Sequence, residues 1–194
     1  MISSKKELRD CLMLDAANYQ EVSGSKRWIH QLSSDPISDQ WYIWRYIRTL
    51  RYCEYYKNHN GVLSKLILRW YMYKLRKYAR ITGFQIPPNT IEAGVTIWHW
   101  GYIIVNPEAC IGTNCTLYAG VQVGHKTPGG RSPRIGDHVF LGSGAKIIGD
   151  ITIGNNVIIG PNAVVTKDVP EDCVIVGNPA YIIKKSGIKV HEKL

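Results

Sequence analysis

The stretch that decides the fold runs from Ile135 to Pro170. Written six residues at a time, it reads IGDHVF, LGSGAK, IIGDIT, IGNNVI, IGPNAV and VTKDVP. The first position of every hexad is Ile, Leu or Val, and the fifth is always apolar and often small. A period of six fits neither an α-helix nor an isolated half-buried strand, but it fits short strands joined by tight turns.

Three such strands make one coil, and stacked coils bury a continuous ladder of aliphatic side chains, as in a parallel β-helix. The same phase recurs upstream at Val105, Ile111, Leu117 and Val123, and, offset by two residues, at Ile91 and Ile97. About twelve hexads therefore predict about four coils. Four hexads carry glycine at the second position: Gly136, Gly142, Gly154 and Gly160. We expect these glycines at the corners of the coil, with a positive φ.

The spacing before the repeat is helical. We expect helices over 5–19, 38–57 and 62–80, with a cap at Ser3 or Ser4, a break at Ser23-Gly24-Ser25 and an end at Asn58 to Gly61. Pro87-Pro88 prevents further helix. The predicted fold class is α+β, with a helical N-terminal region over 1–84, a β-helix over 85–185 and a C-terminal tail over 186–194.

Composition limits the classes of protein that fit. The 194 residues are 45% apolar and 20% charged, which supports a compact core and excludes intrinsic disorder as the main state. Of the 24 Lys and Arg, ten lie between Trp41 and Arg80 against one acid, Glu54, so the net charge of +9 belongs to this window. Eight of the twelve Tyr and three of the six Trp lie there too.

Basic residues interleaved with aromatics have several explanations. The window over residues 41–80 has the composition of a helix at an anionic membrane surface, whereas packing against neighbouring subunits is the alternative. A nucleic-acid-binding module or a scaffold are further alternatives, but no recognised nucleic-acid-binding motif is present. We therefore expect no nucleic acid partner, and peripheral membrane association is one hypothesis for this window.

The cysteines indicate a reducing compartment. Cys11, Cys53, Cys110, Cys115 and Cys173 are odd in number and widely spaced, without a C-x-x-C pair. No apolar run approaches the roughly 18 to 20 residues that span a bilayer, and the N-terminus lacks signal-peptide features. We expect a cytoplasmic protein, peripheral at the inner face of the membrane if the basic window binds lipid.

One segment interrupts the hexads. Between Gly124 and Arg134 the chain reads HKTPGGRSPR, without a single aliphatic residue. An inserted loop on a regular scaffold is a usual location for function.

The residues match a known family at this point. The hexad run, the glycine-rich loop before Pro133-Arg134-Ile135-Gly136 and the closing VVTKDVPEDCVIVGNPAYIIKK (164–185) resemble the hexapeptide-repeat acyltransferases. Within them the chain is most similar to the serine O-acetyltransferase branch and to its relatives that acetylate sugars in surface-polysaccharide pathways. The resemblance covers about Ile86 to Lys185. It implies a left-handed β-helix, acetyl-CoA as co-substrate, and a homotrimer with grooves between neighbouring subunits.

Acetyl transfer to a hydroxyl needs a base and donors for the developing oxyanion, and histidine suits the first task. Four of the six histidines fall in helices, linkers, an outward corner or the tail: His30, His59, His138 and His191. By resemblance, His99 occupies the place of the catalytic histidine of serine acetyltransferases. His125, which opens the loop, resembles the active-site histidine of galactoside and maltose acetyltransferases. Both are candidate bases that we expect to line one cleft, and packing between two tryptophans is the alternative for His99.

Trp98 and Trp100 offer flat apolar faces that can stack on a sugar ring, although aromatic pairs more often serve packing. The remaining site residues follow from the resemblance, and Arg131 is expected to bind the acceptor with the tryptophans. The coenzyme A arm is expected to contact Ser143, Pro161, Thr166, Lys167 and Lys184.

Three departures from the serine acetyltransferases point away from serine. Trp98 replaces their aspartate before the catalytic histidine, Ser132 replaces their loop histidine, and their orienting aspartate is absent near Phe84 or Gln85. We therefore expect a sugar hydroxyl in surface-polysaccharide biosynthesis as the acceptor, with serine as the alternative. A zinc enzyme on the same scaffold would need three converging histidines, and His99 and His125 have no third partner, so we expect no metal.

Overall fold

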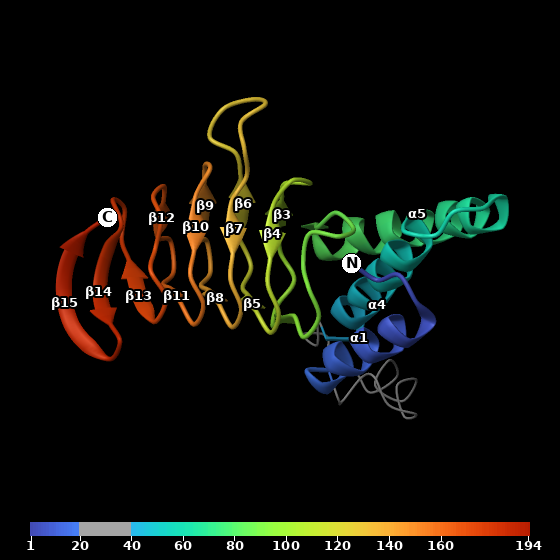
Figure 1. Ribbon diagram of the computed structural model, residues 1–194, viewed down its shortest axis with the longest axis horizontal. Coiled ribbons are helices and arrows are strands. Elements are labelled where there is room, and N and C mark those ends of the chain that lie inside the picture. Colours follow the sequence, from blue (N-terminus) through green and yellow to red (C-terminus); the bar gives the residue numbers. More distant parts are fainter. Residues whose placement is uncertain (20–39) are drawn as a thin grey trace.

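A computed structural model describes residues 1–19 and 40–194 (Figure 1). The expected break at Ser23-Gly24-Ser25, the first residues of the second expected helix and His30 lie outside the described residues.

Three helices precede the strands: α1 (Lys5–Ala17), α4 (Gln40–Lys57) and α5 (Val62–Thr82). A capping box begins α1, because the Ser4 hydroxyl accepts from the Glu7 amide at 3.1 Å and the Glu7 carboxylate accepts from the Ser4 amide at 3.2 Å. Gly83 ends α5 with a φ of 81°, and its amide donates to the Ala79 carbonyl at 2.8 Å. The described parts agree with the helices expected from the spacing.

Short strands then build three parallel sheets around a prism. Sheet A contains β1 (Phe84–Gln85), β3 (Ile103–Val105), β6 (Gln122–Gly124), β9 (Lys146–Ile148) and β12 (Val164–Val165). Sheet B contains β4 (Cys110–Ile111), β7 (Arg134–Ile135) and β10 (Thr152–Ile153). Sheet C contains β2 (Thr96–Ile97), β5 (Thr116–Leu117), β8 (Phe140–Leu141), β11 (Ile158–Ile159) and β13 (Cys173–Val176). The chain visits the sheets in rotation, which confirms a parallel β-helix.

The register explains both irregularities of the repeat. Lys146 pairs with Val164, 18 residues later, which is one coil of three hexads. Gln122 pairs with Lys146, six residues further than a regular coil, so the loop between β6 and β7 inserts one whole hexad. The phase is therefore unchanged across the loop. Thr96 pairs with Thr116, and the two extra residues of this coil account for the offset seen in the sequence.

The inward positions are those that the repeat predicts. All twelve first- and fifth-position side chains between Ile135 and Val169 are at most 7% exposed. They form one continuous core with α4, whose Tyr46 hydroxyl donates to the Ile86 carbonyl at 3.0 Å and accepts from the Ile86 amide at 3.1 Å. The helices thus cover one end of the prism, as Figure 1 shows.

The second-position glycines were predicted to have a positive φ, and this prediction was wrong. Positive φ occurs at the fourth position of the hexads, for example at Asn114, His138 and Asn156. The second-position glycines are needed because the next coil lies against them. At Gly142 a Cβ would be 2.8 Å from the backbone nitrogen of Pro161.

The C-terminal segment also differs from the expectation. Residues 186–194 were predicted to be a tail, but they contain β15 (Ile188–Lys193), which pairs antiparallel with β14 (Tyr181–Lys185). β14 in turn pairs antiparallel with β13, so this hairpin extends sheet C at the end of the prism opposite the helices (Figure 1). No helix among the described residues is long and apolar enough to cross a membrane.

Candidate active site

The predicted site residues divide between two corners of the prism. At the C–A corner the chain passes from sheet C to sheet A, and this corner carries Trp98, His99, Trp100, Ser143 and Pro161. At the A–B corner the chain passes from sheet A to sheet B, and this corner carries His125, Arg131, Thr166 and Lys167. Sheet A separates the two corners. The expectation that both histidines line one cleft is therefore wrong for a single chain.

His99 lies at the C–A corner on the exposed turn between β2 and β3. Its ring centroid is 6.3 Å from that of Tyr118, which occupies the same corner one coil further along, and the rings are inclined by 54°. The Tyr118 ring lies 5.3 Å from that of Phe140 on the next strand of sheet C. The imidazole thus stands beside an aromatic row on the outside of the prism, where a substrate can reach it.

The start of α4 holds the turn that carries His99. The Gln40 side-chain amide donates to the Trp98 carbonyl at 2.8 Å, and the Tyr42 ring stacks on Trp100 with centroids 5.9 Å apart. Trp98 and Trp100 are nevertheless 48% and 40% exposed, so they still offer apolar surface beside the imidazole.

A lysine spans the same corner from sheet A. The Lys146 ammonium donates to the Gly120 carbonyl at 2.6 Å and to the Tyr102 hydroxyl at 3.2 Å. Its nitrogen lies 5.0 Å from the centroid of the Tyr102 ring. These contacts fix the end of the His99 turn to the two following coils.

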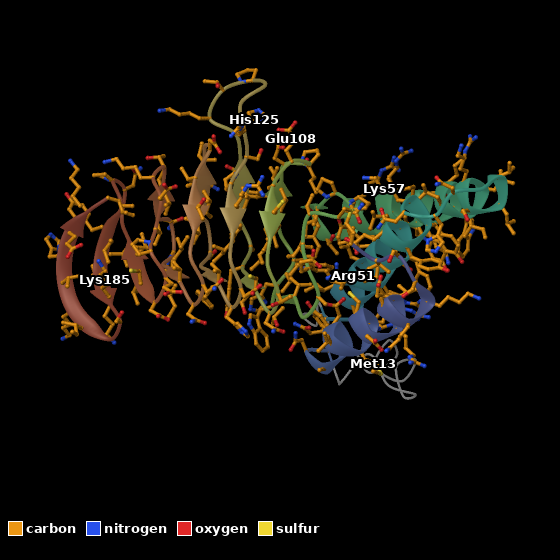
Figure 2. The ribbon with its side chains drawn as sticks, viewed as in Figure 1. Met13, Arg51, Lys57, Glu108, His125 and Lys185 are labelled. Carbon is orange, nitrogen blue, oxygen red and sulfur yellow. The ribbon has the colours of Figure 1, made fainter. Side chains whose placement is uncertain are left out.

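His125 lies at the base of the loop that projects from the A–B corner (Figure 2). Its Nδ1 is 2.8 Å from Nδ2 of Asn106. The Asn106 amide has a defined orientation, because its Oδ1 accepts from the Glu108 amide at 2.9 Å. The Asn106 NH₂ therefore donates to Nδ1, and the proton of the neutral imidazole sits on Nε2. In this tautomer His125 presents a hydrogen-bond donor at Nε2 and not a base.

An apolar cavity of about 570 Å³ adjoins His125. It lies between α5 and the first strands of sheet A, and Leu75, Phe84, Ile86 and Val123 are among its lining side chains. His125 and Asn106 line it together with these apolar groups. His99 does not line this cavity, consistent with its position at the other corner.

The loop itself is polar. The Arg131 guanidinium is exposed and lies 3.7 Å from the Asp150 carboxylate on the next coil. Ser132 is buried, and among the described residues its hydroxyl is the buried side-chain oxygen that has no hydrogen-bond partner. Both residues line a polar cavity of about 390 Å³ with Glu108 and Arg134.

The residues predicted to hold coenzyme A follow the same division. Ser143 and Pro161 are exposed one coil apart at the C–A corner, and the Ser143 hydroxyl donates to the Ala119 carbonyl at 3.0 Å. Thr166 and Lys167 are exposed at the A–B corner, two coils after the loop. Lys184 is exposed on β14, opposite Val174.

Sequence reasoning missed two residues of the site. Asn106 sets the tautomer of His125, and Tyr118 flanks His99. Counting by coils would have found both. Asn106 precedes His125 by about one coil length, and Tyr118 follows His99 by about one coil length. Among residues 1–19 and 40–194, no group of three or more His, Cys, Asp or Glu side chains could hold a metal ion.

Comparisons with known proteins agree with this geometry. The bacterial transferase hexapeptide family, a model of six repeats, matches residues 132–167. A serine acetyltransferase of Staphylococcus aureus is 36% identical over 155 residues, which are 73% of this chain and 72% of that one. A serine acetyltransferase of Synechococcus elongatus is 40% identical over 113 residues, 57% of this chain, and the match spans only 46% of that relative's length.

Solved structures show the same fold. Serine acetyltransferase from Brucella abortus superposes with a TM-score of 0.69 at 22% identity, covering 97% of this chain and 71% of that chain. A serine acetyltransferase in complex with CoA superposes with a TM-score of 0.67 at 25% identity, covering 92% and 71%.

The prism of hexads, capped at one end by helices, defines a left-handed β-helix enzyme of the acyltransferase class. The chain belongs to the hexapeptide-repeat acyltransferases, in the branch whose members are serine acetyltransferases.

Proposed function

We propose that this protein transfers the acetyl group of acetyl-CoA to the side-chain hydroxyl of L-serine. The observation that carries the proposal is the 36% identity over 72% of the length of the S. aureus serine acetyltransferase. The structural neighbour with CoA bound supports acetyl-CoA as the donor. The relatives thus favour serine, the alternative acceptor of the sequence analysis, over a sugar.

His99 is the proposed general base. It takes the proton of the acceptor hydroxyl while the oxygen attacks the thioester carbonyl, and the tetrahedral intermediate then collapses. The C–S bond breaks, and the proton passes from the imidazole to the departing thiolate, so that the products are the ester and free CoA. His99 suits this role because it is exposed beside a surface row of aromatic side chains at a corner of the prism.

His125 has a different proposed role. With its Nδ1 occupied by the Asn106 amide, its Nε2–H is a donor that can stabilise the oxyanion of the intermediate or bind the acceptor. This assignment gives the two candidate bases distinct roles, because His99 removes the proton and His125 donates a hydrogen bond.

The division of the site between two corners supports a homotrimer. Sheet A lies between the C–A and A–B corners. A threefold axis facing the sheet A sides would set the C–A corner of one protomer against the A–B corner of the next. Each cleft would then combine His99, Ser143 and Pro161 of one copy with the loop and Lys167 of its neighbour, and would complete the binding site for CoA.

A sugar hydroxyl is the second candidate acceptor. Trp98 and Trp100 flank His99 and are 48% and 40% exposed, which gives flat apolar surface of the kind that stacks on sugar rings. Trp98 also occupies the position where the serine acetyltransferases have an aspartate. This difference at Trp98 is the observation that favours a sugar as the second candidate acceptor.

The test is release of the CoA thiol from acetyl-CoA with a panel of acceptors: L-serine, nucleotide-linked sugars and free sugars. Saturable turnover with serine, together with a product of the mass of O-acetylserine, is the expected result. Turnover with a sugar alone would replace serine by the second candidate. Thiol release at the background rate with every acceptor would contradict the proposed activity.

A further inference from the structure

A small polar cavity lies between α4 and α5, away from both corners of the prism. Its volume is about 90 Å³. Three cations and three tyrosines provide most of its lining: Arg45, Arg48, Lys74, Tyr52, Tyr71 and Tyr78. All six side chains are half-buried, so the groups are partly removed from water yet accessible to a small solute.

In the described part of the chain, the three cations line one cavity without a neutralising carboxylate. Among the described residues, no Asp or Glu oxygen lies within 4 Å of their nitrogens. Glu54, the acid of the basic window, is instead buried against Arg51 at 3.0 Å. Like charges at close range repel each other, and an anion bound in the cavity would relieve this repulsion.

The pKa of Lys74 is affected by the same excess of positive charge. Loss of hydration, followed by the positive charges of Arg45 and Arg48, holds the pKa of its ammonium below the usual value. A bound anion would offset the contribution of these neighbouring charges to the Lys74 pKa.

Aromatic rings hold the cations in place. The Arg45 guanidinium lies 4.8 Å from the centroid of the Trp41 ring, and the Lys74 nitrogen lies 3.6 Å from that of Trp70. Arg48 lies over Tyr52 at 5.8 Å. The Tyr52 and Tyr71 rings stack nearly parallel, with centroids 4.8 Å apart. The cations are therefore ordered before a ligand arrives, which lowers the entropy lost on binding.

We propose that this cavity binds a single phosphate group. Arginine guanidinium groups match two phosphate oxygens at once, lysine adds a point charge, and the tyrosine hydroxyls can donate to the remaining oxygens. The 90 Å³ volume is well below the roughly 300–1,000 Å³ of sites that enclose whole small molecules, so the site takes the phosphate and leaves any attached group outside.

The phosphate has two sources, a soluble phosphate compound or the headgroup of a lipid. The second source would use apolar side chains that α5 exposes, among them Leu66 and Trp70 at 59% and 51% exposure. Both sources share the same chemistry at the three cations, and the experiment separates them.

Inorganic phosphate is the first probe, added at constant ionic strength while the thermal midpoint of unfolding is recorded. The midpoint of the wild-type protein is expected to rise with phosphate concentration. Arg48→Gln and Lys74→Gln should each weaken the fitted affinity at least about tenfold. Lys77→Gln removes the same charge from an exposed lysine of α5 outside the cavity, and its affinity should stay within about twofold. Circular dichroism without phosphate verifies that every variant is folded.

Vesicles of phosphatidylcholine, with and without phosphatidic acid, identify the source. Binding that requires phosphatidic acid, is displaced by inorganic phosphate and is lost in Lys74→Gln would assign the phosphate to a lipid. Stabilisation by phosphate without vesicle binding would assign it to a soluble compound. The proposal is overturned if phosphate does not stabilise the wild-type protein, if Lys77→Gln weakens binding as much as Lys74→Gln, or if phosphate fails to displace bound vesicles.

Discussion

Arg51 of α4 and Asp15 of α1 form an ion pair beyond the reach of solvent. The Arg51 Nε donates to the Asp15 carboxylate at 2.7 Å, and the two side chains are 1% and 0% exposed. The guanidinium also donates to Glu54 at 3.0 Å and to the Ile91 carbonyl at 2.7 Å, while Asp15 accepts from the Gly94 amide at 2.7 Å. One buried cation thus joins two helices to the first coil of the prism (Figure 2 labels Arg51).

Removal of this carboxylate should be severe. Asp15→Ala leaves the buried guanidinium short of one counterion and the Gly94 amide without its acceptor, so we expect a loss of about 3–5 kcal/mol in the free energy of unfolding. Urea denaturation measures it. Asp10→Ala, which removes a partly exposed carboxylate from the same helix, is the matched control and should cost less than about 0.5 kcal/mol. Equal stability of the two variants would contradict the structural role.

His99→Ala should lower kcat by about 10²- to 10⁴-fold, because it removes the proposed base while the fold stays intact. His125→Ala should lower it less, since the proposed donor serves charge stabilisation and not proton removal. Steady-state kinetics with acetyl-CoA measure both. His138→Asn, at the exposed corner between sheet B and sheet C, is the control, because asparagine tolerates the positive φ of this position. Near-normal turnover by His99→Ala would transfer the role of base to another residue.

The proposed clefts between protomers predict complementation. His99→Ala and Arg131→Ala variants are each expected to be weakly active. Co-expressed in equal amounts, they should recover about a quarter of wild-type activity, because about one cleft in four combines an intact His99 with an intact Arg131. Steady-state kinetics of the unfractionated mixture measure this recovery. Mixed trimers purified through two different affinity tags should reach about a third, because one of their three clefts is intact. Activity no higher than the mean of the two parents would mean that each chain builds its site alone.

Close stacking of the coils should make Gly136, Gly142 and Gly154 intolerant of a methyl group. A Cβ at Gly142 would lie 2.8 Å from the Pro161 nitrogen and 2.9 Å from the Ile159 oxygen, both of them backbone atoms. Gly142→Ala is expected to cost about 1–3 kcal/mol. Gly124→Ala meets its nearest atom at 3.9 Å and should be neutral or stabilising. Thermal denaturation of the pair distinguishes packing from chain entropy.

Of the five thiols, one should react quickly. Burial raises the pKa of Cys11 and Cys53 to about 12 and that of Cys115 to about 11, and Cys173 is also buried. Cys110 is exposed on sheet B. Because the thiolate is the reactive form, iodoacetamide at pH 8 should label Cys110 first, as peptide mass spectrometry would detect. Labelling of several cysteines at similar rates would contradict the packed core, and a slow Cys110 would mean that another copy covers sheet B.

The prism and its core can be predicted from the hexad repeat alone. In a solenoid each coil contacts only its neighbours, so a local period of six is enough to place Ile135, Leu141 and Ile147 inside. The same locality allowed the helices of the N-terminal region to be placed. The glycine prediction failed at Gly136 and Gly142. A side chain at either position is excluded by backbone atoms of the next coil, about 18 residues away, and not by the conformation of its own turn.

The way in which the chemical groups combine depends on three-dimensional packing and could not be predicted from local patterns. The sequence shows His99 and His125 26 residues apart, but the order in which the chain visits three sheets puts them at different corners. In the sequence, Arg51 looks like any other cation of the basic window. In the folded chain it is paired with Asp15, which lies 36 residues away. The cluster of Arg45, Arg48 and Lys74 likewise exists because α4 and α5 lie together. Periodicity reports which side of its own element a residue faces, whereas charge partners and tautomers depend on atoms that only folding brings into contact.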